Sequence, residues 1–291
     1  MKKLSNCPLC SGSDLEHYLK CIDYTKSRKA FSLTLCNTCE FVFTNPRPSS
    51  KEQFKYYEVK DYISHSDTKE GLINWFYHKI RKVNTRLKFN VLGNTKGTVL
   101  EIGSGTGDML SMCKSRGWKT IGIEPCQKAR EIAKKKHNID LLENLNSEIG
   151  KVDRVMLWHV LEHIDELKTL LEHIFQILKK DGELIVAVPN LKSYDAKVYK
   201  EYWAAYDVPR HLSHFQKNSL QKLAENYNYR IRTIKPLWFD SCYISMLSEK
   251  NKNGKCNFWK AARIGLWSNL KAWLFNKEYS SIIAVMTKKH D

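Results

Sequence analysis

The sequence predicts a doubly wound α/β domain preceded by a small cysteine-rich domain, and three features indicate this. An apolar, β-branched run at residues 98–102 leads into a glycine-rich turn and then into the helical apolar spacing that begins at Met109. Strand-like and helix-like segments alternate from there to residue 286, which is the order that a parallel sheet with crossover helices produces. Two Cys-x-x-Cys pairs stand before this alternation begins.

Length and composition describe a folded protein with one large domain and an accessory. The 291 residues are 42% hydrophobic, which is ample for a core. No apolar run approaches the ~18 residues of a membrane span. The start Met1-Lys-Lys-Leu4 is like that of a secretory signal, but residues 6–10 interrupt it before an apolar stretch forms. We therefore expect a cytoplasmic protein, in which the nine cysteines serve as thiols and metal ligands.

The chain is strongly basic, with a net charge of +17 from 48 basic and 31 acidic residues. Such an excess favours a polyanionic partner, for example nucleic acid, a nucleotide-linked sugar or an anionic membrane. A lysine-rich composition spread evenly over the protein explains the same number. Charge alone therefore does not choose among these partners.

Residues 1–45 are predicted to form a zinc ribbon. The two Cys-x-x-Cys pairs, separated by 25 residues, consist of Cys7, Cys10, Cys36 and Cys39. Each pair supplies half of a tetrahedral thiolate site, and zinc is the usual occupant of four sulfurs. Strand-like runs at 17–23 and 31–35 connect the pairs as a ribbon. Because so small a domain needs the folding energy of a metal, we expect the zinc to be structural.

Residues 46–96 are predicted to form a linker and a helical lid. Residues 45–50 (Asn-Pro-Arg-Pro-Ser-Ser) are rich in turn formers. Apolar residues then recur at helical spacing from residue 71 to residue 91. This helix precedes the first strand-like run of the large domain, at residues 98–102.

The glycine turn indicates the ligand of the large domain. Gly103, Gly105 and Gly107 let backbone N–H groups approach a ligand at the positive end of a helix. An acidic residue stands where the dinucleotide fingerprint has its third glycine. Glu101 before the turn suits a cationic group, and Glu124 ends the next strand-like run, where such folds bind ribose hydroxyls. A nucleoside with a cation and no phosphate describes S-adenosylmethionine (SAM).

The segment Glu101-Ile-Gly-Ser-Gly-Thr-Gly107, Glu124 and residues 153–163 together resemble class I SAM-dependent methyltransferases, which have a Rossmann-like, seven-stranded α/β sheet. The resemblance covers residues 97–240, and we assign residues 97–291 to this domain. It implies a SAM site at the turn and at the strand ends, capped by the helices that precede the first strand. The residues so implied are Glu101, Gly103, Ser104, Gly105, Gly107, Glu124, Pro125, Trp158 and His159, with Tyr62 and His65 in the lid. A nucleotide-binding or ligand-free domain of the same layout is the alternative.

Residues 159–163 (His-Val-Leu-Glu-His) also spell the H-x-x-E-H motif of inverted zinc proteases. That chemistry needs both histidines on one helix face, whereas this motif straddles the end of a predicted strand. We therefore set the protease interpretation aside.

The remaining elements follow the order of a doubly wound fold. Helices are predicted at 127–136, 166–179 and 219–226, and strands at 139–142, 152–158, 183–188, 229–234 and 281–286. In the methyltransferases that the chain resembles, the last strand inserts antiparallel beside the fifth.

The segment 206–215 carries the predicted chemistry. Methyl transfer needs proximity, orientation and, when the acceptor is protonated, a base. This segment must pass over the strand ends and holds two histidines, an aspartate and an arginine. Because histidine can act as a base near neutral pH, we expect His211, or in second place His214, to be catalytic. That these histidines only brace the next helix is the alternative. A similar segment occurs in sugar C-methyltransferases and ubiquinone-type O-methyltransferases.

The methyl acceptor is predicted from the order of the two modules. A zinc ribbon followed by a methyltransferase resembles bacterial C-methyltransferases of nucleotide-linked sugars, although those carry a further carboxyl-terminal domain. Zinc-bearing ribosomal RNA methyltransferases also join the two modules, and the charge of +17 suits RNA. We expect a small molecule, a nucleotide-linked or lipid-linked sugar or glycan, ahead of RNA. A zinc-ribbon interaction protein with a degenerate enzyme domain is the third alternative.

Residues 257–276 are predicted to form a basic amphipathic helix. Its apolar side consists mostly of Phe258, Ile264, Leu266, Trp267, Leu270, Trp273 and Leu274. Tryptophans beside lysines on such a helix are what an interfacial anchor needs. We expect either peripheral association with an anionic membrane or packing on the chain's own domain or on a second subunit.

Overall fold

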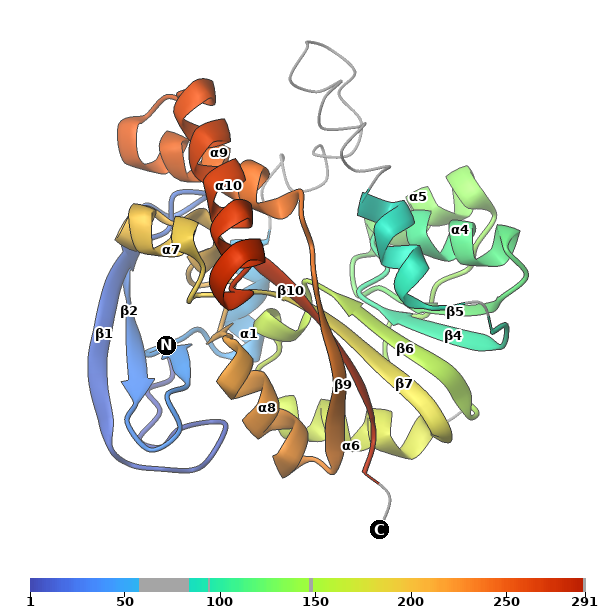
Figure 1. Cartoon of the computed structure of the whole chain (residues 1–291). Helices are drawn as coiled ribbons and strands as arrows, with labels where there is room; N and C mark the ends of the chain where they lie inside the picture. Colours follow the sequence, from blue (N-terminus) through green and yellow to red (C-terminus); the bar gives the residue numbers. More distant parts are fainter. Residues whose placement is uncertain (58–83, 94, 147–148, 290–291) are drawn as a thin grey trace.

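The computed structural model describes residues 1–57, 84–93, 95–146 and 149–289. Within them the chain forms a large mixed sheet and a smaller antiparallel sheet (Figure 1). The large sheet has the order β5-β4-β6-β7-β10-β9. Its strands are β4 (Thr98–Ile102), β5 (Lys119–Ile123), β6 (Val152–Trp158), β7 (Leu178–Pro189), β9 (Tyr229–Pro236) and β10 (Ser281–Lys288).

Strands β5, β4, β6 and β7 run parallel, and β10 lies antiparallel between β7 and β9. The expected antiparallel insertion of the last strand is confirmed. The expected seventh strand, at 139–142, is reduced to a single parallel bridge between Ile123 and Leu142. This correction has a physical reason: the apolar run is short and polar residues follow it. Only Leu142 exchanges backbone hydrogen bonds with the neighbouring strand edge, at Gly122 and Glu124.

Both faces of the large sheet are buried, because successive side chains of a strand point to opposite faces. In β6, Val155 and Leu157 belong to one core cluster, whereas Met156 and Trp158 belong to another. Helices α6 (Leu167–Ile177) and α8 (Lys217–Asn226) cover the first face. Helix α4 (Asp108–Ser115) covers the second face, together with residues 91–92 at the end of a helix that begins within the described residues at 84. Helix α5 is Gln127–His137.

The smaller sheet belongs to the N-terminal ribbon but takes one strand from the large domain. Its order is β1 (Leu15–Ile22), β2 (Ala30–Cys36), β3 (Val42–Thr44) and β8 (Ser213–His214). Phe41 and Phe43 pack into the same core cluster as Phe215 and helix α8. The ribbon and the large domain therefore share a hydrophobic core, and the smaller sheet includes a strand, β8, that lies far beyond residue 45 in the sequence.

Short helices connect the ribbon to the large sheet. They are α1 (Ser50–Gln53), η1 (Phe54–Tyr56), η2 (Leu161–His163), α7 (Tyr194–Tyr199), η3 (Lys200–Tyr202) and η4 (Ala204–Tyr206). Between β9 and β10 stand α9 (Asp240–Asn253) and α10 (Phe258–Lys271), which continues into the π-helical turn η5 (Ala272–Asn276). The helix predicted at 257–276 is thus confirmed. No described helix combines the length and the apolar character needed to cross a membrane.

Candidate active site

The glycine turn after β4 leaves open space for a ligand. Gly103 and Gly105 have positive φ angles of 75° and 51°, a region that glycine adopts without strain. A side chain on Gly103 would lie 2.4 Å from Val160, so glycine also allows close packing there. A Cβ on Gly105 would meet no atom within 4 Å. The turn is therefore tight on one side and open on the other.

Glu101 supplies a buried carboxylate beneath this opening. It is only 4% exposed, and its Oε2 has no hydrogen-bond partner among the described residues. Burial raises the pKa of Glu101 to about 8, although the charge of Lys88 opposes the rise. An unpartnered buried carboxylate is costly unless a cation or a donor meets it. The methionyl ammonium of SAM is such a group, so this residue fits the expected cofactor.

Glu124 follows β5 and reaches back to the turn. One carboxylate oxygen accepts a hydrogen bond from the Gly105 N–H at 2.8 Å, and the other accepts one from the Cys126 N–H at 2.9 Å. Each oxygen keeps a further lone pair, which is what two ribose hydroxyls require. Among the neighbouring predicted residues, Pro125 is exposed, and buried Ser104 donates its hydroxyl hydrogen to the Glu101 carbonyl.

Trp158 and His159 stand at the carboxyl end of β6, as predicted. The indole N–H of Trp158 is buried and has no acceptor among the described residues. His159 has a φ of 57°, with Nε2 3.0 Å from Asp240 and Nδ1 3.5 Å from Glu162. Burial lowers the pKa of His159, but the two carboxylates outweigh this and raise it to about 9. The imidazole is therefore a cation at neutral pH. The predicted lid residues, Tyr62 and His65, lie outside the described residues.

A second cluster joins Glu162, His163 and His211, whose ligand atoms all lie within 4.8 Å of one another. Nδ1 of His211 lies 2.8 Å from the Ala205 carbonyl, which can only accept, so Nδ1 carries the proton. When the His211 ring is neutral, its Nε2 is therefore the proton acceptor, and Oδ2 of Asp207 lies 3.9 Å from it. Nδ1 of His163 lies 2.9 Å from the Tyr57 hydroxyl and 3.1 Å from the Arg210 carbonyl. The cluster can accept a proton, and its donor set also suits a divalent cation.

The charges of this cluster are set by its surroundings. Burial raises the pKa of Glu162, but His159 and His211 together hold it below its usual value. Burial and the nearby charge of His211 lower the pKa of His163 to about 4. At neutral pH the cluster therefore contains an ionised Glu162 and a neutral His163.

His214 lies in the ribbon sheet, apart from this cluster. Its Nε2 is 3.0 Å from the Thr44 hydroxyl, which itself donates to the His211 carbonyl at 2.7 Å. Because that hydroxyl has one hydrogen, Nε2 of His214 must be the donor. Burial, followed by the charge of His211, lowers the pKa of His214 to about 3. The geometry therefore favours His211 over His214 as the base.

Sequence reasoning did not assign Glu162 or Asp240 to the site. Glu162 belongs to the H-x-x-E-H motif. Its position just after the predicted strand at 152–158 is the one sequence signal that could have assigned it to the site. Asp240 is the first residue of α9 and has no local signal, since 81 positions separate it from His159. The protease interpretation fails structurally: residues 161–163 form a single 3₁₀ turn, and His159 precedes it with a left-handed backbone.

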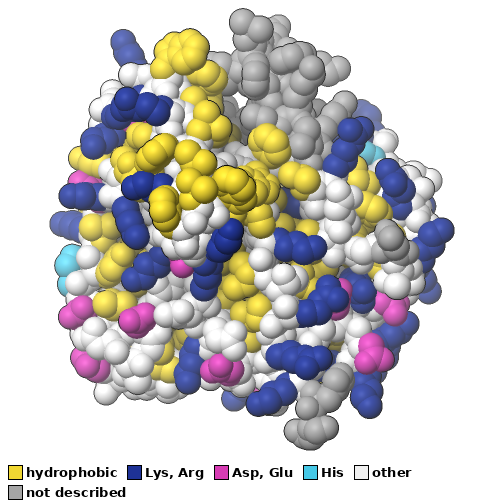
Figure 2. All heavy atoms as spheres, in the orientation of Figure 1, with side chains coloured by type: hydrophobic (Ala, Val, Ile, Leu, Met, Phe, Trp, Pro, Cys, Tyr) yellow, Lys and Arg dark blue, Asp and Glu magenta, His cyan; other side chains and the backbone are white. Residues whose placement is uncertain are grey.

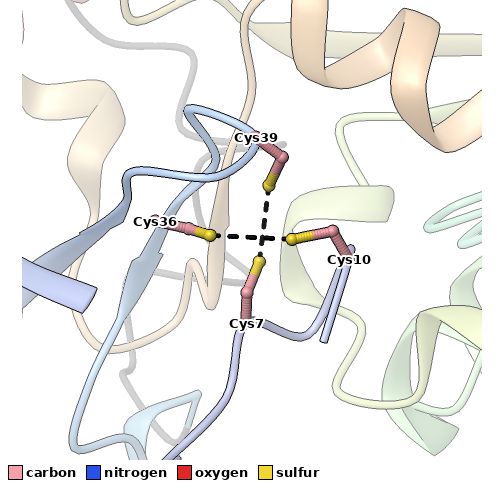
Figure 3. A group of neighbouring side chains, drawn as sticks. All are labelled: Cys7, Cys10, Cys36 and Cys39. Atoms are coloured by element: carbon pink, nitrogen blue, oxygen red, sulfur yellow. Dashed lines mark hydrogen bonds between the residues drawn. The ribbon is translucent and has the colours of Figure 1, made fainter. Parts of the chain in front are cut away.

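The four predicted ribbon cysteines converge from the two knuckles (Figure 3). The Sγ atoms of Cys7 and Cys39 are 3.6 Å apart, as are those of Cys10 and Cys36. A tetrahedral metal with bonds of ~2.3 Å to four sulfurs sets those sulfurs ~3.8 Å apart. The thiolates therefore fit a zinc ion, and they are too far apart for disulfides.

The comparisons with known proteins identify the family of the large domain. A family model described as a methyltransferase domain matches residues 75–234, more than half of the chain. The chain belongs to this methyltransferase family. It is therefore a SAM-dependent methyltransferase, and the interaction-protein alternative is set aside.

Several known proteins are similar to part of this chain. An uncharacterized methyltransferase of Alkaliphilus oremlandii is 26% identical over 163 residues, which are 54% of this chain and 72% of that protein. A demethylmenaquinone methyltransferase of Oceanobacillus iheyensis is 25% identical over 169 residues, which are 53% of this chain and 70% of that protein. The magnesium protoporphyrin IX methyltransferase of Synechocystis PCC 6803 has the same fold, with a TM-score of 0.53 and 13% identity over 82% of this chain and 100% of that one.

Proposed function

We propose that this methyltransferase acts on a nucleotide-linked or lipid-linked sugar or glycan, with His211 as the general base. The observation that carries the proposal is the cluster of Glu162, His163 and His211, in which Nδ1 of His211 donates to a carbonyl and Nε2 is left as the proton acceptor. A hydroxyl, or a carbon beside a carbonyl, must lose a proton as it accepts a methyl group. A buried imidazole beside an ionised carboxylate supplies that proton acceptor.

The cofactor edge and this cluster are joined by a short stretch of chain. Val160 packs against Gly103 of the turn, and the next residues carry Glu162 and His163. SAM, when bound, supplies an activated methyl group on its sulfonium. Glu101 would hold its ammonium, Glu124 its ribose, and His211 would take the acceptor's proton at Nε2. This short connection supports placing acceptor and cofactor side by side.

The zinc ribbon has a supporting role in this proposal. Four thiolates at tetrahedral spacing would bind one zinc and fix the knuckles, which pack on α8. Strand β3 of the ribbon pairs with β8, two residues after His211. We infer that the ribbon positions the segment carrying the base.

RNA is the second candidate, favoured by the net charge of +17. A cluster of lysines surrounds a cavity formed by Lys151, Phe175, Leu178, Lys179, Lys180, Lys288 and Lys289. Lys151 precedes β6, residues 178–180 begin β7, residues 288–289 stand at the end of β10, and Phe175 lies on α6. They lie at the end of the sheet opposite the glycine turn, so a nucleotide held in this cavity would not lie at the cofactor. This arrangement speaks against RNA as the acceptor.

The test is methyl transfer from radiolabelled SAM to three acceptor classes: nucleotide-linked sugars, lipid-linked glycans and total RNA. We expect label in one of the sugar classes and none in RNA, with the signal abolished in His211→Gln. Label in RNA that His211→Gln leaves unchanged would replace the proposal by the second candidate.

A further inference from the structure

Helix α10 and the turn η5 carry their large apolar side chains outward. The exposed members recur at helical spacings of three and four, and their exposed fractions run from 39% to 83%. Apart from Phe258, the first residue of α10, they are Trp259, Leu266, Trp267, Leu270, Trp273, Leu274 and Phe275. We call these seven residues the tryptophan face. Figure 2 shows hydrophobic side chains gathered over the region where Figure 1 draws α10.

The inward side of α10 is made of small residues. Ala261, Gly265, Ser268 and Ala272 are buried at the same helical spacing. A Cβ on Gly265 would lie 2.7 Å from the Cys242 Cα, so α10 packs directly on the backbone of α9. Ile264 also lies inward, whereas the sequence pattern placed it with the tryptophans.

A buried polar contact completes the attachment of α10. Ser268 donates to the carboxylate of Asp195 at 2.7 Å, and that carboxylate also accepts from Trp203 and Ser280. The helix is thus fixed to its own domain through its small side. A helix of a soluble domain normally buries its large apolar side. The tryptophan face is therefore not needed for the attachment of α10 and calls for an external partner.

Basic residues predominate in the stretch of chain that carries this face, and one of them, Lys260, pairs with the buried Glu249. Residues 250–277 contain seven lysines and arginines and no aspartate or glutamate. Arg263 and Lys277 are exposed within the same stretch. The ammonium of Lys271 lies 4.3 Å from the Tyr194 ring centroid and 6.0 Å from that of Trp267. Lys and Arg side chains also border the apolar patch in Figure 2.

We propose that the tryptophan face is a docking surface for an anionic lipid bilayer. A helix of 19 residues, 258–276, is ~28 Å long and can lie in the plane of the interface with its tryptophans at the level of the headgroups. The flanking cations meet anionic headgroups, and the two attractions add. A second copy of this chain on a two-fold axis would instead set two basic faces against each other.

Helices α9 and α10, which carry the proposed docking surface, adjoin the carboxyl ends of the strands where the cofactor is expected to bind. Asp240, the first residue of α9, contacts His159 at the end of β6. A bilayer under α10 would therefore lie near the acceptor side of the site. Docking itself requires no acceptor, so it can be tested apart from the proposed function.

The experiment is co-sedimentation of the full chain with vesicles of phosphatidylglycerol mixed with phosphatidylcholine, at low and at physiological salt. We expect binding to these vesicles, weaker binding to phosphatidylcholine alone, and a loss of at least ~100-fold in Trp267→Ser/Trp273→Ser, since each buried tryptophan contributes about tenfold or more. Arg263→Gln/Lys277→Gln should weaken binding mainly at low salt. Phe54→Ser, an exposed apolar residue on η1, is the matched control and should bind as the wild type does.

Unfolding midpoints and SAM affinity establish that the variants are folded, because the replaced side chains are exposed. In the wild type, brominated lipid should quench part of the fluorescence of the eight tryptophans. Absence of wild-type binding at both salts would overturn the proposal, as would equal binding by the double tryptophan variant. It would also be overturned if the chain is a dimer that this variant dissociates, with no vesicle binding in either form.

Discussion

Asp23 of the ribbon and Arg210 of the large domain form a buried ion pair, with 3.4 Å between Oδ1 and Nη2. Both residues are 1% exposed. Arg210 also pairs with Asp207, and it donates to the carbonyl of Tyr56 at 3.4 Å. Since Arg210 immediately precedes His211, this contact ties the ribbon to the segment that holds the proposed base.

Replacing Asp23 by asparagine should therefore destabilise the protein and lower turnover more than SAM affinity. The change keeps the shape but removes a buried charge partner, which costs about 3 kcal/mol. Urea unfolding, calorimetric SAM binding and turnover would measure the three effects. Glu172→Gln, an exposed carboxylate on α6, is the control and should change stability by less than about 0.5 kcal/mol.

The same pair gives an expected acid dependence. Burial would raise the pKa of Asp23, but hydrogen bonds from Ser27 and Lys26 and the charge of Arg210 hold it below its usual value. A carboxylate whose pKa is lower in the folded protein than in the unfolded chain stabilises the fold at pH values above the unfolded-chain pKa of ~3.9. That stabilisation is lost as the pH falls through the pKa of the folded protein. Asp23→Asn should therefore lose less stability than the wild type between neutral pH and pH ~3.

The ribbon cysteines should bind one zinc per chain, and Cys36→Ser should abolish it. We expect this variant to loosen the ribbon and to lose turnover, because β3 no longer holds β8. SAM affinity should stay within a few-fold, since the glycine turn follows β4 in the other sheet. Metal analysis under reducing conditions, calorimetry and turnover would measure this. Cys256→Ser, an exposed thiol, is the control; equal zinc content in both variants would contradict the assignment.

Much of the fold could be predicted from the sequence because its signals are local. The run from 152 to 158 is a strand with those bounds, and the strand–glycine–helix order placed Glu101 and Glu124 correctly at the strand ends. These elements depend on apolar runs and on turn chemistry, which a single segment contains.

The rest of the site depends on contacts between distant residues. Asp240 reaches His159, and Asp23 reaches Arg210, across separations that no local pattern records. The pattern at 257–276 identified the helix but not its orientation. The small residues Gly265 and Ser268 decide which side is buried, through the backbone of α9 and the carboxylate of Asp195. Periodicity weighs large apolar residues and therefore points to the opposite side.

Removing the carboxylate of Glu124 should weaken SAM binding by about 2–3 kcal/mol, or roughly 30- to 150-fold. The reason is that two ribose hydroxyls would lose their acceptors while the N–H groups of Gly105 and Cys126 lose theirs. Calorimetry with Glu124→Ala measures the change, with Glu131→Ala on α5 as the exposed control. Wild-type affinity in Glu124→Ala would show that the cofactor binds elsewhere.

Binding of SAM should release a proton from Glu101 at neutral pH. Burial raises the pKa of this carboxyl to about 8, so it is largely protonated in the free protein. A bound ammonium favours the carboxylate and lowers that pKa. Affinity should therefore rise from pH 6 to pH 8 and then level off.

Calorimetry at pH 7 in two buffers of different ionisation enthalpy detects the released proton. The wild type should give buffer-dependent enthalpies, whereas Glu101→Gln should not. The free energy of unfolding of the SAM-free protein should show the opposite pH dependence. Because the folded protein keeps a proton on Glu101 that the unfolded chain releases, the free protein loses stability as the pH rises from ~4.3 to about 8. A wild-type enthalpy that is the same in both buffers would argue against an ammonium at Glu101.

The two histidines that the sequence suggests as bases should have different roles, His211 in turnover and His214 in stability. Nε2 of His211 is available in the cluster with Glu162, so His211→Gln should lower turnover by ~10²- to 10⁴-fold and leave SAM affinity within a few-fold. His214 donates to Thr44 inside the ribbon sheet, so His214→Gln should cost about 1 kcal/mol of stability and change turnover only a few-fold. Turnover, calorimetry and urea unfolding on both variants make the comparison. The reverse result, with turnover lost in His214→Gln and kept in His211→Gln, would transfer the base to the ribbon sheet and require the acceptor to bind there.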